Sequence, residues 1–208
     1  MGSGKLTLRD AGGGFTSLSW DHTDNLWAAG PMNVVMLPAT PKPSAGPFPV
    51  VVPPYQSDSC PGTSGAVTEL RVAPDGVRVA LVIAGQQATL AFGAIVMQDQ
   101  SHAGQQQSLV RVNLSPFFVC GPQGAFRSLS WYGADNVVAL GQDGATLTEY
   151  PVDGGTQLPI LGKAGTQSIT ARKGAGLIAA VGDTMFIDPS PTGAWNLVGA
   201  GLSPAYPG

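Results

Sequence analysis

Charged side chains are scarce in this sequence of 208 residues. Lys, Arg, Asp and Glu make up 11% of it, and the formal net charge is −3; typical soluble domains are about 25% charged. No cluster of Lys and Arg offers the positive charge that neutralises nucleic-acid phosphates, which argues against binding of DNA or RNA. No apolar run approaches the roughly 20 residues that a membrane-spanning helix needs.

Residues for catalysis or metal binding are equally few. The only histidines are His22 and His102, and no Gly-x-Ser-x-Gly motif is present, so a Ser-His-Asp hydrolase is not indicated. Two cysteines cannot supply a four-ligand zinc site. The Gly174-Ala-Gly176 segment has the spacing of a dinucleotide fingerprint, but we expect a strand after it where that fingerprint requires a helix. We therefore predict no catalytic residues, no cofactor and no metal.

Glycine and proline are abundant, with 29 and 18 residues, and favour many short strands joined by turns. Segments 15–28 and 126–139 match at eight of fourteen positions without a gap. Weaker copies begin at Val67 and Ser168. With Ser17, Glu69, Ser128 and Ser168 in register, the steps are 52, 59 and 40 residues, a spacing typical of repeat folds.

Each repeat alternates polar and apolar residues, turns, and continues into an apolar run, as a β-hairpin does. Asp75-Gly76 is the clearest turn, since glycine accepts the positive φ that such turns need. We predict four strands per unit and an all-β fold, a β-propeller with four blade-like repeats. The predicted strands of the second and third units are 67–73, 77–84, 88–97 and about 108–113, then 127–132, 136–141, 145–150 and 157–161.

Residues outside the repeats define the expected domain limits and loops. Met1–Gly4 resembles a segment added by cloning, and 5–208 is predicted to be one propeller domain or the C-terminal part of a larger one. Leu6–Leu8 is predicted to be either the outer strand of a preceding blade or a strand that closes the ring. Residues 38–62 are predicted to be an exposed loop with some extended structure, and residues 98–107 a connection between strands.

Four tryptophans and two cysteines have specific expected roles. Trp20 and Trp131 hold equivalent repeat positions and are expected in blade cores. Trp27 and Trp195 are less constrained, and one of them is a candidate for a binding face, where Trp is enriched. Cys60 and Cys120 precede consecutive units by similar distances, and the sequence leaves open whether they form a disulfide.

Particular motifs resemble a known family. The Leu70–Val82 stretch, with its Ala-Pro-Asp-Gly turn, resembles blades of TolB-like propellers. Four features in order are similar to the C-terminal β-propeller of the actinobacterial lipoprotein LpqB family. They are Ser17-Leu-Ser-Trp-Asp with the following Asn25-Leu-Trp27, the Arg71–Ala80 segment, the region of Trp195, and the final Pro204-Ala-Tyr-Pro-Gly208.

This resemblance implies an extracytoplasmic protein, lipid-anchored to the cell membrane through an anchor absent from this sequence. It implies a preceding GerMN-type domain and a link to the sensor kinase MtrB of the MtrAB two-component system, with effects on cell division and the envelope. We therefore expect a non-catalytic protein-interaction propeller. The alternatives are a propeller that binds a carbohydrate or other small ligand, and a hydrolase that uses the central channel.

Overall fold

The computed structural model describes residues 14–31, 33–39, 48–53, 60, 66–102, 105–122, 124–172 and 174–200, with the backbone alone at 99–102, 105–108 and 172. The regular elements in these ranges are β-strands. None of the described residues belongs to a helix of the length and hydropathy needed to cross a membrane. Leu6–Leu8 and the Pro204–Gly208 ending lie outside these ranges.

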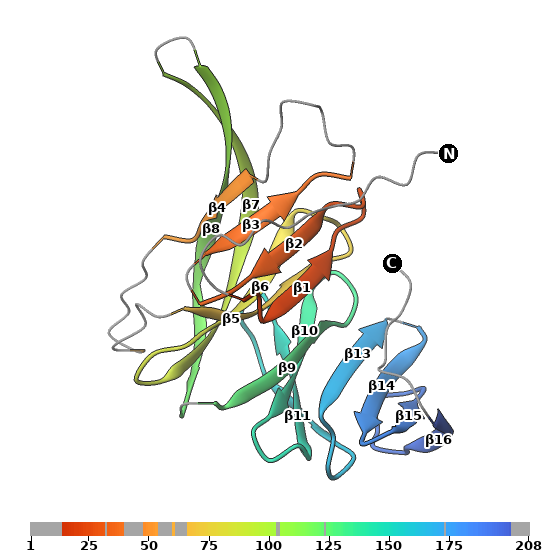
Figure 1. Ribbon diagram of the computed structural model, residues 1–208. Helices are drawn as coiled ribbons and strands as arrows, with labels where there is room; N and C mark the ends of the chain where they lie inside the picture. Colours follow the sequence, from red (N-terminus) through yellow and green to blue (C-terminus); the bar gives the residue numbers. More distant parts are fainter. Residues whose placement is uncertain are drawn as a thin grey trace, which may run out of the picture.

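The described strands form four successive antiparallel units, called blades 1 to 4 here, which follow one another around an axis (Figure 1). Blades 1 and 2 are β1 Ser17–Trp20, β2 Leu26–Ala29, β3 Val34–Leu37 and β4 Phe48–Val51, then β5 Val67–Val72, β6 Arg78–Ile83, β7 Ala88–His102 and β8 Gln105–Gly121. Blades 3 and 4 are β9 Phe126–Trp131, β10 Asn136–Gly141, β11 Thr146–Pro151 and β12 Leu158–Leu161, then β13 Ser168–Arg172, β14 Gly176–Val181, β15 Thr184–Asp188 and β16 Asn196–Ala200. The predicted all-β propeller architecture is confirmed.

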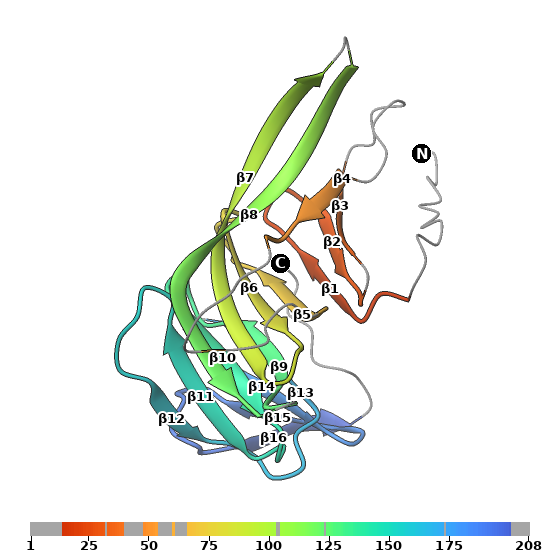
Figure 2. The same ribbon diagram turned by 90° about the vertical axis from the view of Figure 1, so that its left-hand side faces the viewer.

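Strands β7 and β8 differ most from the prediction. They pair from Ala88↔Gly121 to His102↔Gln105, so most of segment 98–107 is strand, and its assignment to a connection between strands is wrong. That assignment followed from the polarity of the segment. An antiparallel ladder uses backbone groups alone, so a polar sequence can extend a hairpin that apolar residues begin. The resulting ribbon projects well beyond the blades (Figure 2).

A parallel contact joins the first two blades at their outer strands. Val50 and Val51 of β4 pair with Val110 and Arg111 of β8, which merges blades 1 and 2 into one eight-stranded sheet. The strand β4 lies inside the segment 38–62, which the sequence predicts to be an exposed loop with some extended structure. The ribbon is therefore anchored at its base by both blades.

The hydrophobic core lies between consecutive blades. In β6, Val79 and Leu81 pack toward blade 1, while Ala80 and Val82 pack toward blade 3. In the same way Val138 and Leu140 of β10 pack against blade 4, together with Leu177 of that blade. The second strand of a blade is apolar on both faces because each face meets a neighbouring blade.

The tryptophans on these blades correct two sequence-based expectations. Trp27 is only 1% exposed, and its indole N–H donates to Asp21 Oδ2 at 2.9 Å, so its assignment to a binding face is wrong. It points from β2 into the core between blades 1 and 2. Trp131 is 5% exposed and lies in a core as expected, whereas Trp20, at the equivalent repeat position, is 60% exposed.

Cys60 and Cys120 form a disulfide with their Cα atoms 5.6 Å apart. Cys120 lies in β8, so the bond ties the chain that precedes β5 to the outer strand of blade 2. It closes a loop of 60 residues that contains β5, β6, β7 and most of β8.

Replacing Trp131 tests the arrangement of the core. Trp131→Ala should lower the free energy of unfolding by roughly 3–5 kcal/mol, because it removes a buried ring between blades 2 and 3. Trp131→Phe keeps most of the ring and loses only the N–H bond to the Arg71 carbonyl, so about 1–2 kcal/mol is expected. Denaturant unfolding measures both. A loss below about 1 kcal/mol for the alanine variant would mean that Trp131 is exposed.

Removing the disulfide tests the link between the pre-β5 segment and β8. Closing a loop of this length restricts the unfolded chain by about 4 kcal/mol on the chain-entropy account, so the Cys60→Ala/Cys120→Ala variant should lose roughly 2–4 kcal/mol. Wild-type protein unfolded under reducing conditions is the control and should show a similar loss. Equal stability of the oxidised, reduced and variant proteins would contradict the assignment.

Candidate functional site

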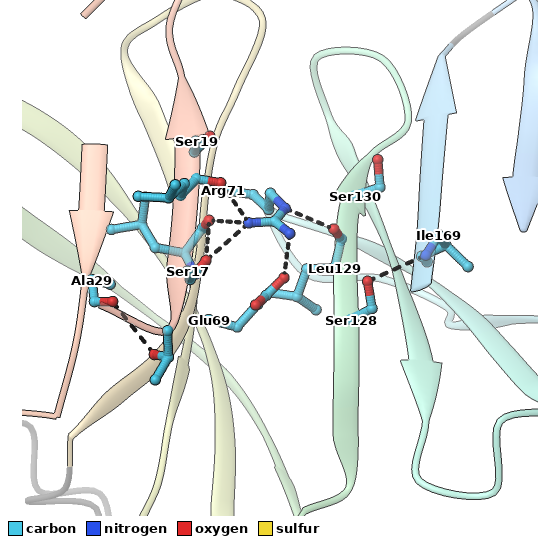
Figure 3. Close-up of polar contacts among 12 residues, drawn as sticks. Ser17, Ser19, Ala29, Glu69, Arg71, Ser128, Leu129, Ser130 and Ile169 are labelled. Atoms are coloured by element: carbon cyan, nitrogen blue, oxygen red, sulfur yellow. Dashed lines mark hydrogen bonds and ion pairs between the residues drawn. The ribbon is translucent and has the colours of Figure 1, made fainter. Parts of the chain in front are cut away.

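The first strands of the blades line the axis of the molecule. The strands β1 and β5, β5 and β9, and β9 and β13 lie side by side, but none of these strands pairs with its neighbour from the other blade. In β5, β9 and β13, one edge pairs with the second strand of the same blade, and the other edge faces the preceding blade. Backbone groups on that second edge are removed from water and need partners. Side chains from the neighbouring blade supply them (Figure 3).

Two serines of β1 bond to the backbone of β5. The Leu70 N–H donates to Ser17 Oγ at 3.0 Å, and the Val72 N–H donates to Ser19 Oγ at 3.0 Å. Ser17 Oγ also lies 3.2 Å from the Leu70 carbonyl, to which it donates. Both serines are buried. Their hydroxyl groups therefore fix the register of blade 2 against blade 1.

The same connection recurs between blades 3 and 4. The Ile169 N–H donates to Ser128 Oγ at 3.3 Å, and the Ala171 N–H donates to Ser130 Oγ at 2.7 Å. The Ser-x-Ser pattern that marks the repeats in the sequence is thus the chemical connector between consecutive blades. Because the residues alternate along a strand, the two serines point to the next blade while the intervening leucine points to the previous one.

Blade 2 carries a charged pair where blades 1 and 3 carry serines. Arg71 Nε donates to the Leu129 carbonyl at 3.2 Å, and its Nη1 donates to Ser17 Oγ at 2.9 Å and to the Leu18 carbonyl at 3.0 Å. Its Nη2 lies 2.7 Å from Glu69 Oε1. Arg71 therefore contacts the inner strands of three blades, and Glu69 holds it in place.

Burial sets the electrostatics of this pair. It raises the pKa of the Glu69 carboxyl above 4.5, although the charge of Arg71 and hydrogen bonds from the Leu129 N–H and the Ser17 hydroxyl oppose the rise. The carboxylate and the guanidinium are both occupied by partners within the wall of the axis. Removing either member would leave the other charge partly buried without its partner, which would destabilise the fold. The pair therefore joins the blades as a unit.

The structure keeps the remaining chemically active residues apart. His22 lies in the exposed turn between β1 and β2, and His102 ends β7 in the projecting ribbon. The Gly174–Gly176 turn leads directly into β14. Across the part of the chain that is described, no three His, Cys, Asp or Glu side chains lie close enough to hold a metal ion.

Trp195, the second candidate for a binding face, is half-buried. Its ring packs on the core between blades 3 and 4, and its indole N–H donates to the Leu161 carbonyl at 2.9 Å. The residue thus joins blade 4 to the outer strand of blade 3 and leaves only part of its ring to solvent. Sequence reasoning did not single out Arg71 and Glu69, although the repeat register already placed both at the serine positions.

Comparisons with known proteins agree with this architecture. The chain matches the family model described as the lipoprotein LpqB beta-propeller domain over residues 2–207. A search of curated proteins finds no match. Solved structures that it resembles include a chain of the mitotic checkpoint complex, with TM-score 0.55, 12% identity and coverage of 87% of this chain and 49% of that chain.

Another similar structure is the Cps50 (Swd1) beta-propeller domain of Myceliophteria thermophila, with TM-score 0.51 and 12% identity over 82% of this chain and 51% of that one. At this identity the likeness shows the fold alone. The chain spans about half the length of the two structures that it matches.

The Arg71–Glu69 pair yields a prediction about stability and its pH dependence. Arg71→Met should lower the free energy of unfolding by roughly 1–3 kcal/mol near neutral pH, because it leaves the half-buried Glu69 carboxylate without its partner. The Arg71→Met/Glu69→Leu variant should recover part of this loss. Denaturant unfolding across pH measures both.

The sign of the pH effect follows from the raised pKa of Glu69. A folded protein that holds this proton more tightly than the unfolded chain loses stability as pH rises from about 4.5 through the raised pKa. Arg71→Met should therefore lie closest to wild type below that pH and fall further behind above it. A deficit that is independent of pH, or equal in the double variant, would show that the pair does not join the blades electrostatically.

Proposed function

Because this chain belongs to the family of LpqB lipoprotein β-propeller domains, we propose that it is a non-catalytic protein-interaction module of a cell-envelope lipoprotein. Its partner in this proposal is the extracytoplasmic region of a sensor kinase, MtrB of the MtrAB system, so that the module is accessory to signalling that affects cell division and the envelope. The lipid anchor of the full-length protein would hold it on the outer face of the membrane. The Cys60–Cys120 bond supports this location, because disulfides persist in oxidising compartments.

The projecting ribbon of β7 and β8 is the observation that carries the proposal (Figure 2). On one side of β7, pairing with β6 ends at Ala94, and the Ile95 N–H donates to the Val77 carbonyl at 2.8 Å. From Val96 to His102, no described strand pairs with that edge. A long edge with free N–H and C=O groups is a template on which a partner can add a strand. Its distance from the blades leaves room for a second protein.

The residues that line the axis favour a binding function over a catalytic one. Its polar side chains, Ser17, Ser128, Glu69 and Arg71 among them, are engaged in bonds between blades. A propeller enzyme needs acid, base or nucleophilic groups that converge on a substrate and remain available to it. The ribbon, in contrast, requires no chemistry beyond its backbone edge and its side chains.

Shortening the ribbon tests the proposed function. In the test variant, Asn-Gly replaces residues 98–109, so that the pair Met97↔Val110 and the contact with β4 remain. Calorimetric titration with the purified extracytoplasmic region of the sensor kinase should show binding by the wild type and at least a tenfold weaker complex with the short variant, about 1.4 kcal/mol. His22→Ala, in an exposed turn, is the control and should bind as wild type.

Two experimental results would contradict this proposal. Equal affinity of the short variant and the wild type would move the contact away from the ribbon. Hydrolysis of a sugar or peptide panel by the purified chain, lost on His22→Ala or His102→Ala, would replace the non-catalytic function with an enzymatic one.

A further inference from the structure

The outer edge of β7 continues along the projecting ribbon beyond its pairing with β6 (Figure 2). The Ile95 N–H donates to the carbonyl of Val77, which directly precedes β6, so the backbone groups of Ile95 point away from β8. From Gly93 to His102 the pairing of β7 with β8 contains no shift of register. Backbone groups of successive residues point to opposite sides of a strand, so every second residue after Ile95 presents its N–H and C=O on this edge. These residues are Met97, Asp99 and Ser101.

The other edge of the ribbon shows how such groups are used. Val50 and Val51 of β4 pair with Val110 and Arg111 of β8 as a parallel strand, although β4 belongs to blade 1 and β8 to blade 2. A strand from another part of the molecule therefore already extends the ribbon on that side. On the β7 edge, the strands in the described ranges supply no such partner after Ile95.

Apolar side chains are exposed where the β7 edge leaves the blade. Met97 and Val77 are each 55% exposed. Met97 pairs with Val110 and Ile95 with Val112, and both of these valines are buried in the core between blades 1 and 2. Side chains of paired residues lie on the same side of a sheet, so the side of the ribbon that carries Met97 continues this core outward. A strand beside β7 covers Met97 when it places an apolar side chain on that side.

The opposite side of the ribbon carries a positive charge. Val96 pairs with Arg111 of β8, and Arg111 is exposed. The ion pairs among the described residues involve Arg71 and Arg78, and none of them involves Arg111. An arginine side chain is long enough to span the neighbouring strand. An acidic residue on this side of an added strand therefore meets an opposite charge.

We propose that an extended segment of the partner adds to the β7 edge as a further β-strand, with apolar side chains on the side of Met97 and an acidic side chain on the side of Arg111. A strand is the occupant that pairs with the outward N–H and C=O groups of alternate residues together. This inference rests on the proposed function, because it takes the sensor-kinase region as the source of the segment. It adds the mode of recognition and the pattern of residues that the segment carries.

Proline substitutions on the two edges of the ribbon test strand addition. Asp99→Pro or Ser101→Pro removes an outward N–H and places a ring on the β7 edge, while β7 keeps its bonds to β8. Each should raise the dissociation constant for the purified extracytoplasmic region of the sensor kinase roughly tenfold or more in calorimetric titration. Gln106→Pro is the matched control and should bind as the wild type. Gln106 pairs with Ser101, so its own N–H points outward at the edge of β8.

Hydrogen exchange follows the same edge residue by residue in the wild type. In the free protein the amides of Met97 and Asp99 should exchange fast, whereas those of Gln98 and Gln100, which point toward β8, should exchange slowly. In the complex, exchange at Met97 and Asp99 should slow roughly tenfold or more. Loss of protection at Gln98 in a proline variant would reveal a disturbed ribbon, and the wild-type comparison then decides.

Charge reversal tests the acidic residue of the added strand. Arg111→Glu should raise the dissociation constant about tenfold, because it places like charges on the two strands. Lys163→Glu makes the same change of charge beside the Phe186 ring of blade 4 and should bind as the wild type. Equal affinity of Arg111→Glu and the wild type would contradict the acidic side chain in the proposed pattern.

The remaining outcomes separate strand addition from the proposed function. Weak binding by the short-ribbon variant, together with wild-type binding by Asp99→Pro and Ser101→Pro and unchanged exchange at Met97, would overturn strand addition and leave the ribbon as the contact. Weaker binding by Gln106→Pro alone would place the contact on the edge of β8 and overturn strand addition on β7. Wild-type affinity of the short-ribbon variant would overturn both proposals.

Discussion

Hydroxyl groups of one inner strand that accept backbone N–H groups of the next hold the blades in register. Ser17 and Ser19 do so for blade 2, and Ser128 and Ser130 do so for blade 4. Each bond contributes only about 1 kcal/mol net, but a buried donor without a partner costs about 1–3 kcal/mol. The register in turn determines which aliphatic side chains meet between blades, so the hydrophobic core depends on these few polar contacts.

At the junction of blades 2 and 3, a charged pair takes the place of the serines and bonds to the backbone of the next blade. Arg71 reaches the inner strands before and after its own, and Glu69 balances its charge inside the wall of the axis. The polar groups at the axis are thus engaged in holding the blades together. The ribbon of β7 and β8, in contrast, projects from blade 2 away from the axis (Figures 1 and 2).

The strands of blades 2 and 3 were predictable to within one residue, except in β7 and β8, because alternation and the Asp-Gly turn are local signals. The length of the ribbon was not, because residues 98–107 are polar and their pairing uses the backbone. The burial of Trp27 and the exposure of Trp20 also escaped prediction. Whether a side chain on a blade is covered depends on the neighbouring blade, and two repeats with nearly the same sequence, such as those of Trp20 and Trp131, can differ in that respect.

Native-state hydrogen exchange measures the connection between blades most directly. In the wild type, the amides of Leu70, Val72, Ile169 and Ala171 should exchange as slowly as amides paired within a blade. The Ser17→Ala/Ser19→Ala variant should lose protection at Leu70 and Val72 while Ile169 and Ala171, which bond to Ser128 and Ser130, keep theirs. Unchanged protection at Leu70 and Val72, or an equal loss at all four amides, would contradict the account that serine hydroxyl groups join each blade to the next.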